Sequence, residues 1–556
     1  MEIFLQAFLE IANVQTLMLM TIGAAAGLIS GAIPGFTIAM GVVLTLPFTF
    51  GMNASQGIAT MIGVFVGGLS GGLMSGILTG IPGTPSSVAT TFDGFPMARR
   101  GQPGFALGLG VWASFFGGII SAIMLVALAP QLARLGLEFQ PWDYFSLVFF
   151  ALTITASLSG ENMIKGLIAG MLGLFIATIG EDDVNGIARF DFGIDYLRDG
   201  FGFLPVLIGL FAFSQLMSDV RDPKDARAKL SQTEEMDIRI EHRRAAIAVL
   251  RRWKNLIVSS LIGMFTGILP AAGSAISNIL AYDQAKKMSP NPEEFGLGCE
   301  DGIIAPESAN NATAGGSLIT MMALGIPGDV ITAVMLGALL IHDVVPSPSF
   351  INDSPVLANA IFIAFFFANF LVLFLQSGLL RAFVLITKVR MYMLASVILA
   401  FCGIGVFALN NVTSDIWTLF FFGIFGYVFR SLGFPLAPLI LGVVLGPVAE
   451  SWLARALAIS SDPVLFVTNP WSLFFLIMAA FSIGFSFYQK QRGHSRWADF
   501  YIPALALSLS VPVFMMGGYV RPVLAVGLIA VGLWMLWQAW HRKGQIEPSN
   551  DAARPT

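Results

Sequence analysis

Hydrophobic residues dominate this chain in long blocks. Apolar stretches of about 17 to 25 residues recur along almost all of the sequence, and each is long enough to cross a hydrocarbon core about 30 Å thick. Segments such as 361–375 are apolar on every side, whereas the strands of a membrane barrel alternate apolar and polar residues. The pattern predicts an all-α, polytopic integral membrane protein that crosses a lipid bilayer.

Composition supports this class. The 556 residues are 56% hydrophobic and 12% charged, whereas soluble domains carry roughly 25% charged residues. The 59 glycines and 28 prolines cluster inside the apolar segments, where such residues mark broken helices around a site. The net charge of −4 gives no sign of a nucleic-acid partner, and none is expected.

One long polar stretch, 219–254, divides the chain. It is rich in Arg and Lys, so the positive-inside rule places it in the cytoplasm. We therefore expect two membrane repeats, 15–218 and 255–470, joined by this cytoplasmic linker. An N-terminal interfacial helix (1–14) should precede them, and further transmembrane helices (471–540) and a cytoplasmic tail (541–556) should follow.

Three motifs occur twice in the same order. The first half contains GAIPG (31–35), GIPGTPSS (80–87) and GFLPVLIG (202–209). The second half contains GILPAAG (267–273), GIPGDV (325–330) and GFPLAPLILG (433–442). The loop after the first GIPG carries Arg99 and Arg100, whereas 342–355 after the second has no Lys or Arg. Opposite sidedness predicts two inverted-topology repeats. Such repeats are typical of secondary transporters, with the site near the middle of the membrane.

The first motif of each repeat is expected to form a re-entrant hairpin. Segment 255–282 begins and ends beside cytoplasmic positive charge, yet it is too short for two crossings of about 20 residues each. It should turn at Pro270, and its partner, 15–50, at Pro34. The alternative is a single proline-kinked helix in each place.

The first GIPG motif predicts a break and a restart. Pro82 and Gly83 should end the helix, because proline lacks an N–H group and glycine tolerates positive φ. The following TPSS resembles a helix cap and first turn, whose backbone N–H groups suit an anion. We expect substrate contacts from Thr84, Ser86 and Ser87. An ordinary satisfied cap in a kinked helix is the alternative.

The second repeat has a comparable polar segment at 305–316, APESANNATAGG. Buried amides are costly unless they bind a partner, so Asn310, Asn311 and Thr313 are predicted substrate ligands. Polar contacts between helices are the alternative. Asp329 follows the second GIPG, where it can cap the next helix or take part in cation or proton binding.

A coupling ion, Na⁺ or H⁺, is the one cofactor that these features suggest. Sodium would be held by oxygens of unwound backbone, at positions Pro34, Gly35, Pro270, Ala271, Gly325 and Gly328. A proton would be carried by Glu307 or Asp329, because a buried carboxyl group can take up a proton near neutral pH.

Enzyme motifs are absent from the sequence. The four histidines lie in or beside polar segments and form no metal-binding cluster. No P-loop occurs, and the GxSxG match at 68–72 lies inside an apolar segment rather than at a strand-to-helix turn. Cys299 and Cys402 support no disulfide framework and are expected to be buried thiols. We expect no enzymatic activity and no firmly held metal.

Three blocks resemble the large membrane subunit of the bacterial tripartite tricarboxylate transporters. They are GAIPGFTIAMGVVLTLPFTFG, GILTGIPGTPSSVATTFDGFPMARRG and EDGIIAPESANNATAGGSLITMMALGIPGDVITAVMLGALLIH, and the resemblance covers about 27–470. The chain departs from the expected glycine-richer turns at Phe36, Thr37 and Ala271. The resemblance implies a small four-helix membrane subunit, a periplasmic binding protein, and gradient-driven import across the bacterial inner membrane.

The sequence thus favours alternating-access transport of a small tri- or dicarboxylate, bound between the two GIPG breaks. A passive anion channel and a non-transporting assembly subunit are the competing classes. The sequence leaves open which carboxylate is carried, the oligomeric state, and whether 471–540 replaces or docks against the small subunit.

The repeat inversion predicts a labelling pattern. Single cysteines at Ala98 and Gln284 should react with a membrane-impermeant maleimide only from the cytoplasmic side, and one at Asp343 only from outside, because of the charge bias of the loops. Labelling of the Ala98 and Asp343 positions from the same side would contradict the inversion.

Overall fold

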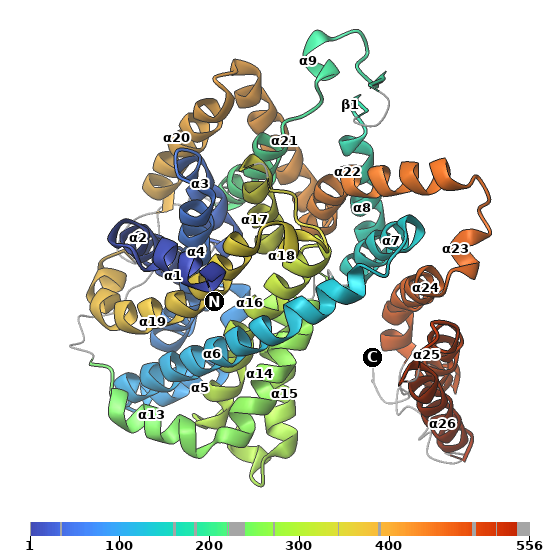
Figure 1. Cartoon of the computed structure of the whole chain (residues 1–556). Helices are drawn as coiled ribbons and strands as arrows, with labels where there is room; N and C mark the ends of the chain where they lie inside the picture. Colours follow the sequence, from blue (N-terminus) through green and yellow to red (C-terminus); the bar gives the residue numbers. More distant parts are fainter. Residues whose placement is uncertain are drawn as a thin grey trace, which may run out of the picture.

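The computed structural model is almost entirely helical (Figure 1). It describes residues 2–33, 36–158, 163–182, 186–219, 221, 239–270, 273–342, 344–386, 391–491, 496–518 and 520–541. Among these residues the one sheet is a two-stranded ladder of β1 (Gly180–Glu181) and β2 (Ala188–Arg189). Pro34, Gly35, Ala271 and Asp343 lie outside the described residues.

Seven helices in the described part of the chain are long and apolar enough to cross a membrane. They are α2 (Val14–Ala32), α4 (Ala54–Thr79), α6 (Pro103–Gly136), α19 (Pro355–Ile386), α22 (Leu436–Ile459), α25 (Arg496–Met515) and α26 (Val520–His541). The prediction of an all-α, multi-pass membrane protein is confirmed.

The other helices of the first part of the chain are mostly shorter. They are α1 (Glu2–Ala12), α3 (Ile38–Thr49), η1 (Pro85–Ser87), α5 (Val88–Arg99), α7 (Pro141–Leu158), α8 (Met163–Ala177), α9 (Asp195–Arg198), α10 (Phe203–Ile208), η2 (Gly209–Phe213) and α11 (Ser214–Asp219).

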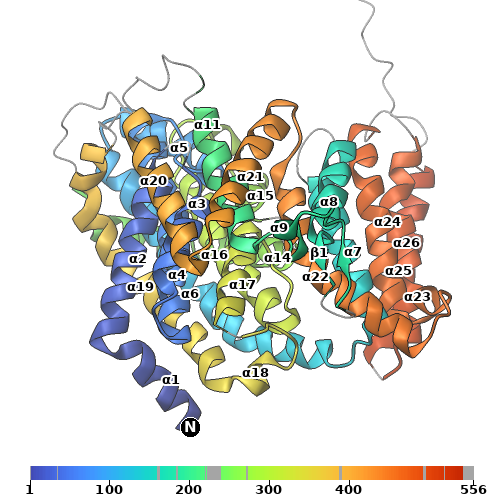
Figure 2. The same cartoon turned by 90° about the horizontal axis from the view of Figure 1, so that it is seen from above.

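The helix α16 (Asp301–Leu324) is central in both views of the molecule (Figures 1 and 2). The remaining helices are α13 (His242–Arg251), α14 (Trp253–Ile268), α15 (Gly273–Met288), η3 (Pro292–Glu294), α17 (Val330–Ile341), α18 (Phe350–Asp353), α20 (Met391–Asn410), α21 (Thr413–Ser431), α23 (Leu465–Thr468) and α24 (Pro470–Gln491).

Each predicted hairpin consists of two helices. α14 ends at Ile268, α15 begins at Gly273, and the two pack against each other. α2 and α3 form a similar contacting pair in the first repeat. Each place thus holds two packed helices rather than a single proline-kinked helix, and the re-entrant course of the hairpins stays a prediction.

Glycines let the first arm of each hairpin approach the following long helix. A Cβ atom on Gly27 or Gly31 of α2 would overlap the backbone carbonyl of Val64 or Gly68 in α4. In the second repeat, Cβ atoms on Gly263 and Gly267 of α14 would overlap the carbonyls of Ala309 and Thr313 in α16. Small residues at this spacing are typical of membrane helices in close contact.

The two GIPG motifs form matching breaks. α4 ends at Gly80 (φ 76°) and α16 ends at Gly325 (φ 70°), and both positions favour glycine because left-handed backbone is strained with a side chain. The chain then turns back, so that the N–H group of Gly83 donates to the carbonyl of Gly72 (3.3 Å). The positive φ expected at Gly83 is wrong: it falls at Gly80.

Gly83 is needed for space rather than for φ. A Cβ atom on Gly83 would overlap the carbonyl of Gly31, and one on Gly328 would overlap the carbonyl of Gly267. Each returning loop therefore rests on the end of the hairpin arm of its own repeat.

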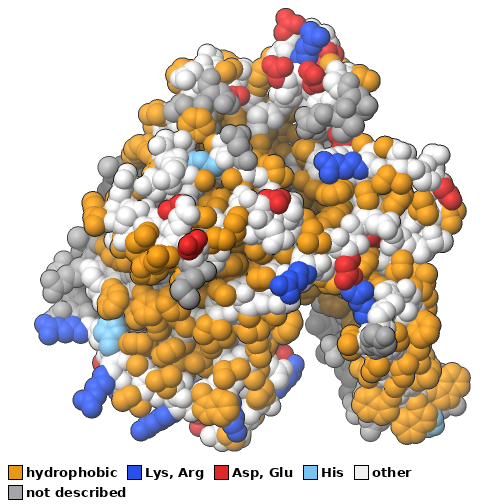
Figure 3. Space-filling model, in the orientation of Figure 1, with side chains coloured by type: hydrophobic (Ala, Val, Ile, Leu, Met, Phe, Trp, Pro, Cys, Tyr) orange, Lys and Arg blue, Asp and Glu red, His pale blue; other side chains and the backbone are white. Residues whose placement is uncertain are grey.

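The C-terminal helices form one edge of the molecule (Figures 1 and 2). α24 packs on α7, where Ser146 and Ser472 share a hydrogen bond (2.6 Å) and the ring of Phe139 contacts Trp471 (4.9 Å between centroids). Hydrophobic side chains cover the outer surface of α25 and α26 (Figure 3), among them Val523 and Trp537, as expected of lipid-facing helices.

The glycine contacts predict a stability difference. Gly27→Ala and Gly263→Ala should each destabilise the protein by about 1–3 kcal/mol, because the added methyl group overpacks a helix contact. Gly527→Ala in α26 is the control, since its Cβ atom would meet nothing within 4 Å. Melting temperatures in detergent measure the effect, and equal values for all three variants would contradict the packing argument.

Candidate functional site

α15 connects the start of α5 with α16. The side-chain Oδ1 of Asn278 accepts a hydrogen bond from the backbone N–H of Ala89 (2.8 Å), and its Nδ2 donates to Thr90 Oγ1 (3.4 Å). The preceding residue, Ser277, shares a hydrogen bond with Thr313 of α16 (2.8 Å). All of these residues are fully buried. One turn of α15 therefore links the two repeats through polar contacts.

Glu307 lies next to this contact. Its carboxylate accepts hydrogen bonds from Thr90 of α5 (2.6 Å) and Ser114 of α6 (2.9 Å), and the residue has no exposed surface. These two donors are neutral hydroxyls. Thr90 thus touches both Asn278 and Glu307, so the buried carboxylate belongs to the same polar cluster as the helix start.

The two adjacent amides of α16 differ in how fully they are used. Asn311 accepts from Ser70 of α4 (2.8 Å) and donates to the backbone carbonyl of Glu307 (3.2 Å). Asn310 donates to the backbone carbonyl of Leu69 (2.9 Å), but its buried Oδ1 has no hydrogen-bond partner among the described residues. Asn311 thus makes the polar helix contacts of the alternative hypothesis, whereas only the amide nitrogen of Asn310 does so.

The residue after each GIPG motif caps the next helix. Thr84 precedes η1, and its backbone N–H donates to Ser87 Oγ (3.4 Å), while its hydroxyl shares a hydrogen bond with Ser86 (2.9 Å). Asp329 accepts from the backbone N–H of Thr332 (2.7 Å) and from Ser317 Oγ (3.1 Å). The expected cap at Asp329 is confirmed.

Both predicted substrate-binding sets meet α4 over a short stretch. A Cβ atom on Gly72 would meet the hydroxyls of Thr84 and Ser87, and the amides of α16 bond to positions 69 and 70. Thr313 joins them through Ser277. The structure therefore brings Thr84, Ser86, Ser87, Asn310, Asn311 and Thr313 to one region between the repeats.

The predicted coupling-ion positions separate into groups. A Cβ atom on Gly273, three residues after Pro270, would lie 3.9 Å from the Cβ of Asp329. Gly325 lies at the start of the loop between α16 and α17, against the carbonyl of Pro346. Glu307 and Ser317, the partner of Asp329, are ten residues apart on α16, which corresponds to roughly 15 Å along a helix. The two carboxylates therefore occupy different places.

Five residues of the cluster were not among the predicted ligands: Ser70, Thr90, Ser114, Ser277 and Asn278. Asn278 is an amide in a hairpin that was predicted to enter the membrane, which was a usable signal. The hydroxyl residues carry no such signal, because a Ser or Thr in a membrane helix commonly bonds to its own backbone.

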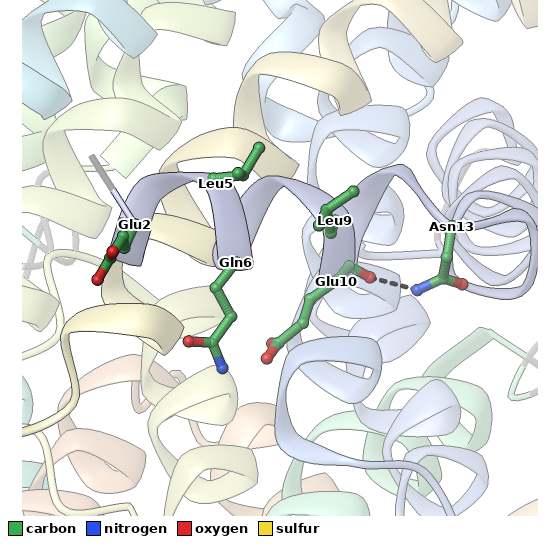
Figure 4. Close-up of a pocket in the computed structure, with 6 residues that line it drawn as sticks. All are labelled: Glu2, Leu5, Gln6, Leu9, Glu10 and Asn13. Carbon is green, nitrogen blue, oxygen red and sulfur yellow. Dashed lines mark hydrogen bonds between the residues drawn. The ribbon is translucent and has the colours of Figure 1, made fainter.

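A surface groove along α1 lies apart from this cluster (Figure 4). It is lined by Glu2, Leu5, Gln6, Leu9, Glu10 and Asn13. None of the predicted site residues belongs to it.

Comparison with known proteins identifies the family. The model of the "Tripartite tricarboxylate transporter TctA family" matches residues 17–441, more than three quarters of the chain. The chain belongs to the TctA family. TctA proteins are subunits of tricarboxylate transporters with several components, so this multi-pass chain is a subunit of such a system. α24, α25 and α26 follow the matched region.

Two Agrobacterium vitis proteins are similar to this TctA-family chain. An uncharacterized 52.8 kDa protein in the TAR-I ttuC' 3'region is 33% identical over 81% of this chain and 88% of its own length. An uncharacterized protein in the TAR-II ttuC' 3'region is 38% identical over 37% of this chain and 86% of its own length. No solved structure matches the chain.

The hydrogen bonds predict distinct effects of alanine substitutions. Ser86→Ala, Ser87→Ala and Asn310→Ala should lower uptake of a radiolabelled tricarboxylate severalfold, since each lost hydrogen bond is worth about 1 kcal/mol or more. Asn311→Ala should also lower the melting temperature, because it separates α16 from Ser70.

Asn359→Ala is the control for these variants, since that amide bonds within its own helix to Pro355 (2.7 Å). Uptake and the amount of folded protein in the membrane are measured together. Normal uptake in all four variants would place the substrate elsewhere.

Proposed function

We propose that this chain is the translocating subunit of a secondary active importer of a small tri- or dicarboxylate. It works in the bacterial inner membrane by alternating access, with the substrate between the two GIPG breaks. The observation that carries the proposal is the pair of matched breaks, each followed by a capped helix start that lies in the buried region between the repeats.

Two contacts support an inverted arrangement of the repeats. A Cβ atom on Gly57, near the start of α4, would lie 2.9 Å from the ring of His342 at the end of α17. At the other end, a Cβ atom on Gly302, near the start of α16, would overlap Asp93 of α5. The short helix of each repeat thus ends beside the start of the long helix of the other repeat, as alternating access between inverted repeats requires.

The chemistry of the cluster suits a carboxylate. Thr84, Ser86 and Ser87 offer hydroxyls beside the backbone N–H groups of a helix start, which favour anions. The free acceptor of Asn310 can receive a hydrogen bond from a substrate hydroxyl or a protonated carboxyl group. Hydroxy-acids and partly protonated carboxylic acids provide both kinds of group.

The coupling ion is proposed to be a proton or sodium, with different sites. A buried carboxylate held only by neutral donors is costly, so a proton or a cation at Glu307 would stabilise the cluster. For sodium, the proposed ligands are backbone oxygens near Pro270 and Gly328, while the Asp329 carboxylate caps α17.

We also propose that a periplasmic binding protein delivers the carboxylate and that a small membrane subunit completes the assembly. Family membership supports additional subunits. Helices α25 and α26 pack on each other, α25 also packs on α24, and the pair leaves apolar residues exposed that a further subunit could cover.

Uptake under imposed gradients tests the transport proposal. Vesicles that contain the assembled transporter should accumulate a radiolabelled tricarboxylate above its external concentration when a sodium or pH gradient is applied. Equilibration without accumulation would indicate a channel, and absence of flux would indicate an assembly subunit.

Substitutions distinguish the two coupling ions. If a proton drives uptake, a protonophore and Glu307→Gln should each abolish accumulation, because the carrier of the proton is lost. If sodium drives uptake through backbone oxygens, accumulation should survive both Glu307→Gln and Asp329→Asn. Sodium-independent uptake that is lost in Glu307→Gln would refute the carbonyl site.

A further inference from the structure

Asp93 is a buried carboxylate that the proposed substrate site does not use. It lies in α5 and has no exposed surface. Its Oδ1 accepts from the backbone N–H groups of Gly296 (2.9 Å), Gly298 (2.8 Å) and Cys299 (2.7 Å), and its Oδ2 accepts from the Tyr282 hydroxyl (2.9 Å). All four donors belong to the second repeat, whereas Asp93 belongs to the first.

The loop between α15 and α16 is shaped around this carboxylate. Gly296 (φ 89°) and Gly298 (φ 93°) adopt left-handed backbone, which lets successive N–H groups converge on one acceptor. Gly302 leaves no room for a Cβ atom beside Asp93 Oδ2. Hydrogen bonds to an ionised acceptor are strong, so this contact holds the loop against α5.

Aromatic rings cover the same contact. The ring of Tyr282 meets Phe92 of α5 edge to face (5.3 Å between centroids) and Phe295 of the loop in the same way (5.4 Å). The end of the α5 and α15 pair is thus closed by hydrogen bonds and by edge-to-face aromatic contacts.

This contact lies one helical turn from the substrate region. Tyr282 follows Asn278 by four residues on α15, and Asp93 follows Thr90 by three on α5, so each pair lies on one helix face. α5 and α15 therefore meet at two successive levels: Asn278 with Thr90 and Ala89, then Tyr282 with Asp93.

We propose that Asp93 is a positioning residue that latches the cytoplasmic ends of α5 and α15, closes the inner end of the carboxylate path, and must release for substrate to leave. The inference rests on the proposed alternating access, in which one repeat moves against the other. Loss of the latch shifts the population toward the inward-open state.

The matched positions of the other gate carry apolar side chains. Ala338 lies ten residues after Gly328 as Asp93 lies ten after Gly83, and Leu46 lies fifteen after Gly31 as Tyr282 lies fifteen after Gly267. Both counterparts are buried and apolar. The Asp93–Tyr282 hydrogen bond therefore has no equivalent at these two matched positions, which can part at lower cost.

Sided labelling tests the latch without any substrate. In a background with Cys299→Ser and Cys402→Ser, Ser86→Cys is exposed to a membrane-impermeant maleimide from either side of oriented vesicles. Asp93→Ala should raise its labelling rate from the cytoplasmic side by about tenfold or more, because several hydrogen bonds to a charged acceptor are lost. Tyr282→Phe, which keeps the ring, should give a smaller rise from the same side.

Asp143→Asn is the matched control, since Asp143 is also a fully buried carboxylate that accepts a backbone N–H, from Gln140 (2.7 Å), but lies in α7. Unchanged labelling in Asp93→Ala and Tyr282→Phe, a rise from the outer side or from both sides, or an equal rise in the control would overturn the latch. Should Asp93→Ala fail to fold, Tyr282→Phe carries the test alone. A chain that does not transport carboxylates would fail the uptake assay while leaving this labelling result intact.

Discussion

The close approach of backbones through glycine is the contact on which the site depends. Within lipid there is little hydrophobic drive between helices, so association relies on packing and polar contacts. Gly27 and Gly31 let α2 lie against α4, and Gly263 and Gly267 do the same for α14 and α16. The same hairpin ends then receive Gly83 and Gly328. The carbonyl groups at the hairpin ends leave no room for a Cβ atom, and this close contact fixes where both helix breaks lie against the hairpins.

Polar groups inside this packing are almost all committed to one another. Thr90 links Glu307 to Asn278, and Asn311 links α16 to Ser70. Such networks stay stable in a low-dielectric interior only when satisfied. The unpaired Oδ1 of Asn310 is therefore informative, since an unsatisfied buried acceptor is costly unless a ligand supplies the missing hydrogen bond.

The two repeats share a backbone plan but differ in side chains. Both have a hairpin, a glycine-terminated long helix and a capped short helix. The side chains at matched positions, however, differ: the buried carboxylate Asp93 has the apolar Ala338 as its counterpart. The shared plan is compatible with the proposed alternating access, and the unequal side chains place the Asp93 hydrogen bonds at one end of it.

The sequence by itself determined the membrane class, the two hairpins and the two helix breaks, because hydropathy, glycine and proline act locally on the backbone. It also marked Thr84, Asn310 and Asp329 as polar groups in unusual places. Only the tertiary structure decided which of them meet, since Asn278, Thr90 and Glu307 lie far apart in the chain and carry no local signal of their contact. It also moved the left-handed glycine from Gly83 to Gly80. Gly83 is required instead by the carbonyl of Gly31, a contact with another helix that no local pattern contains.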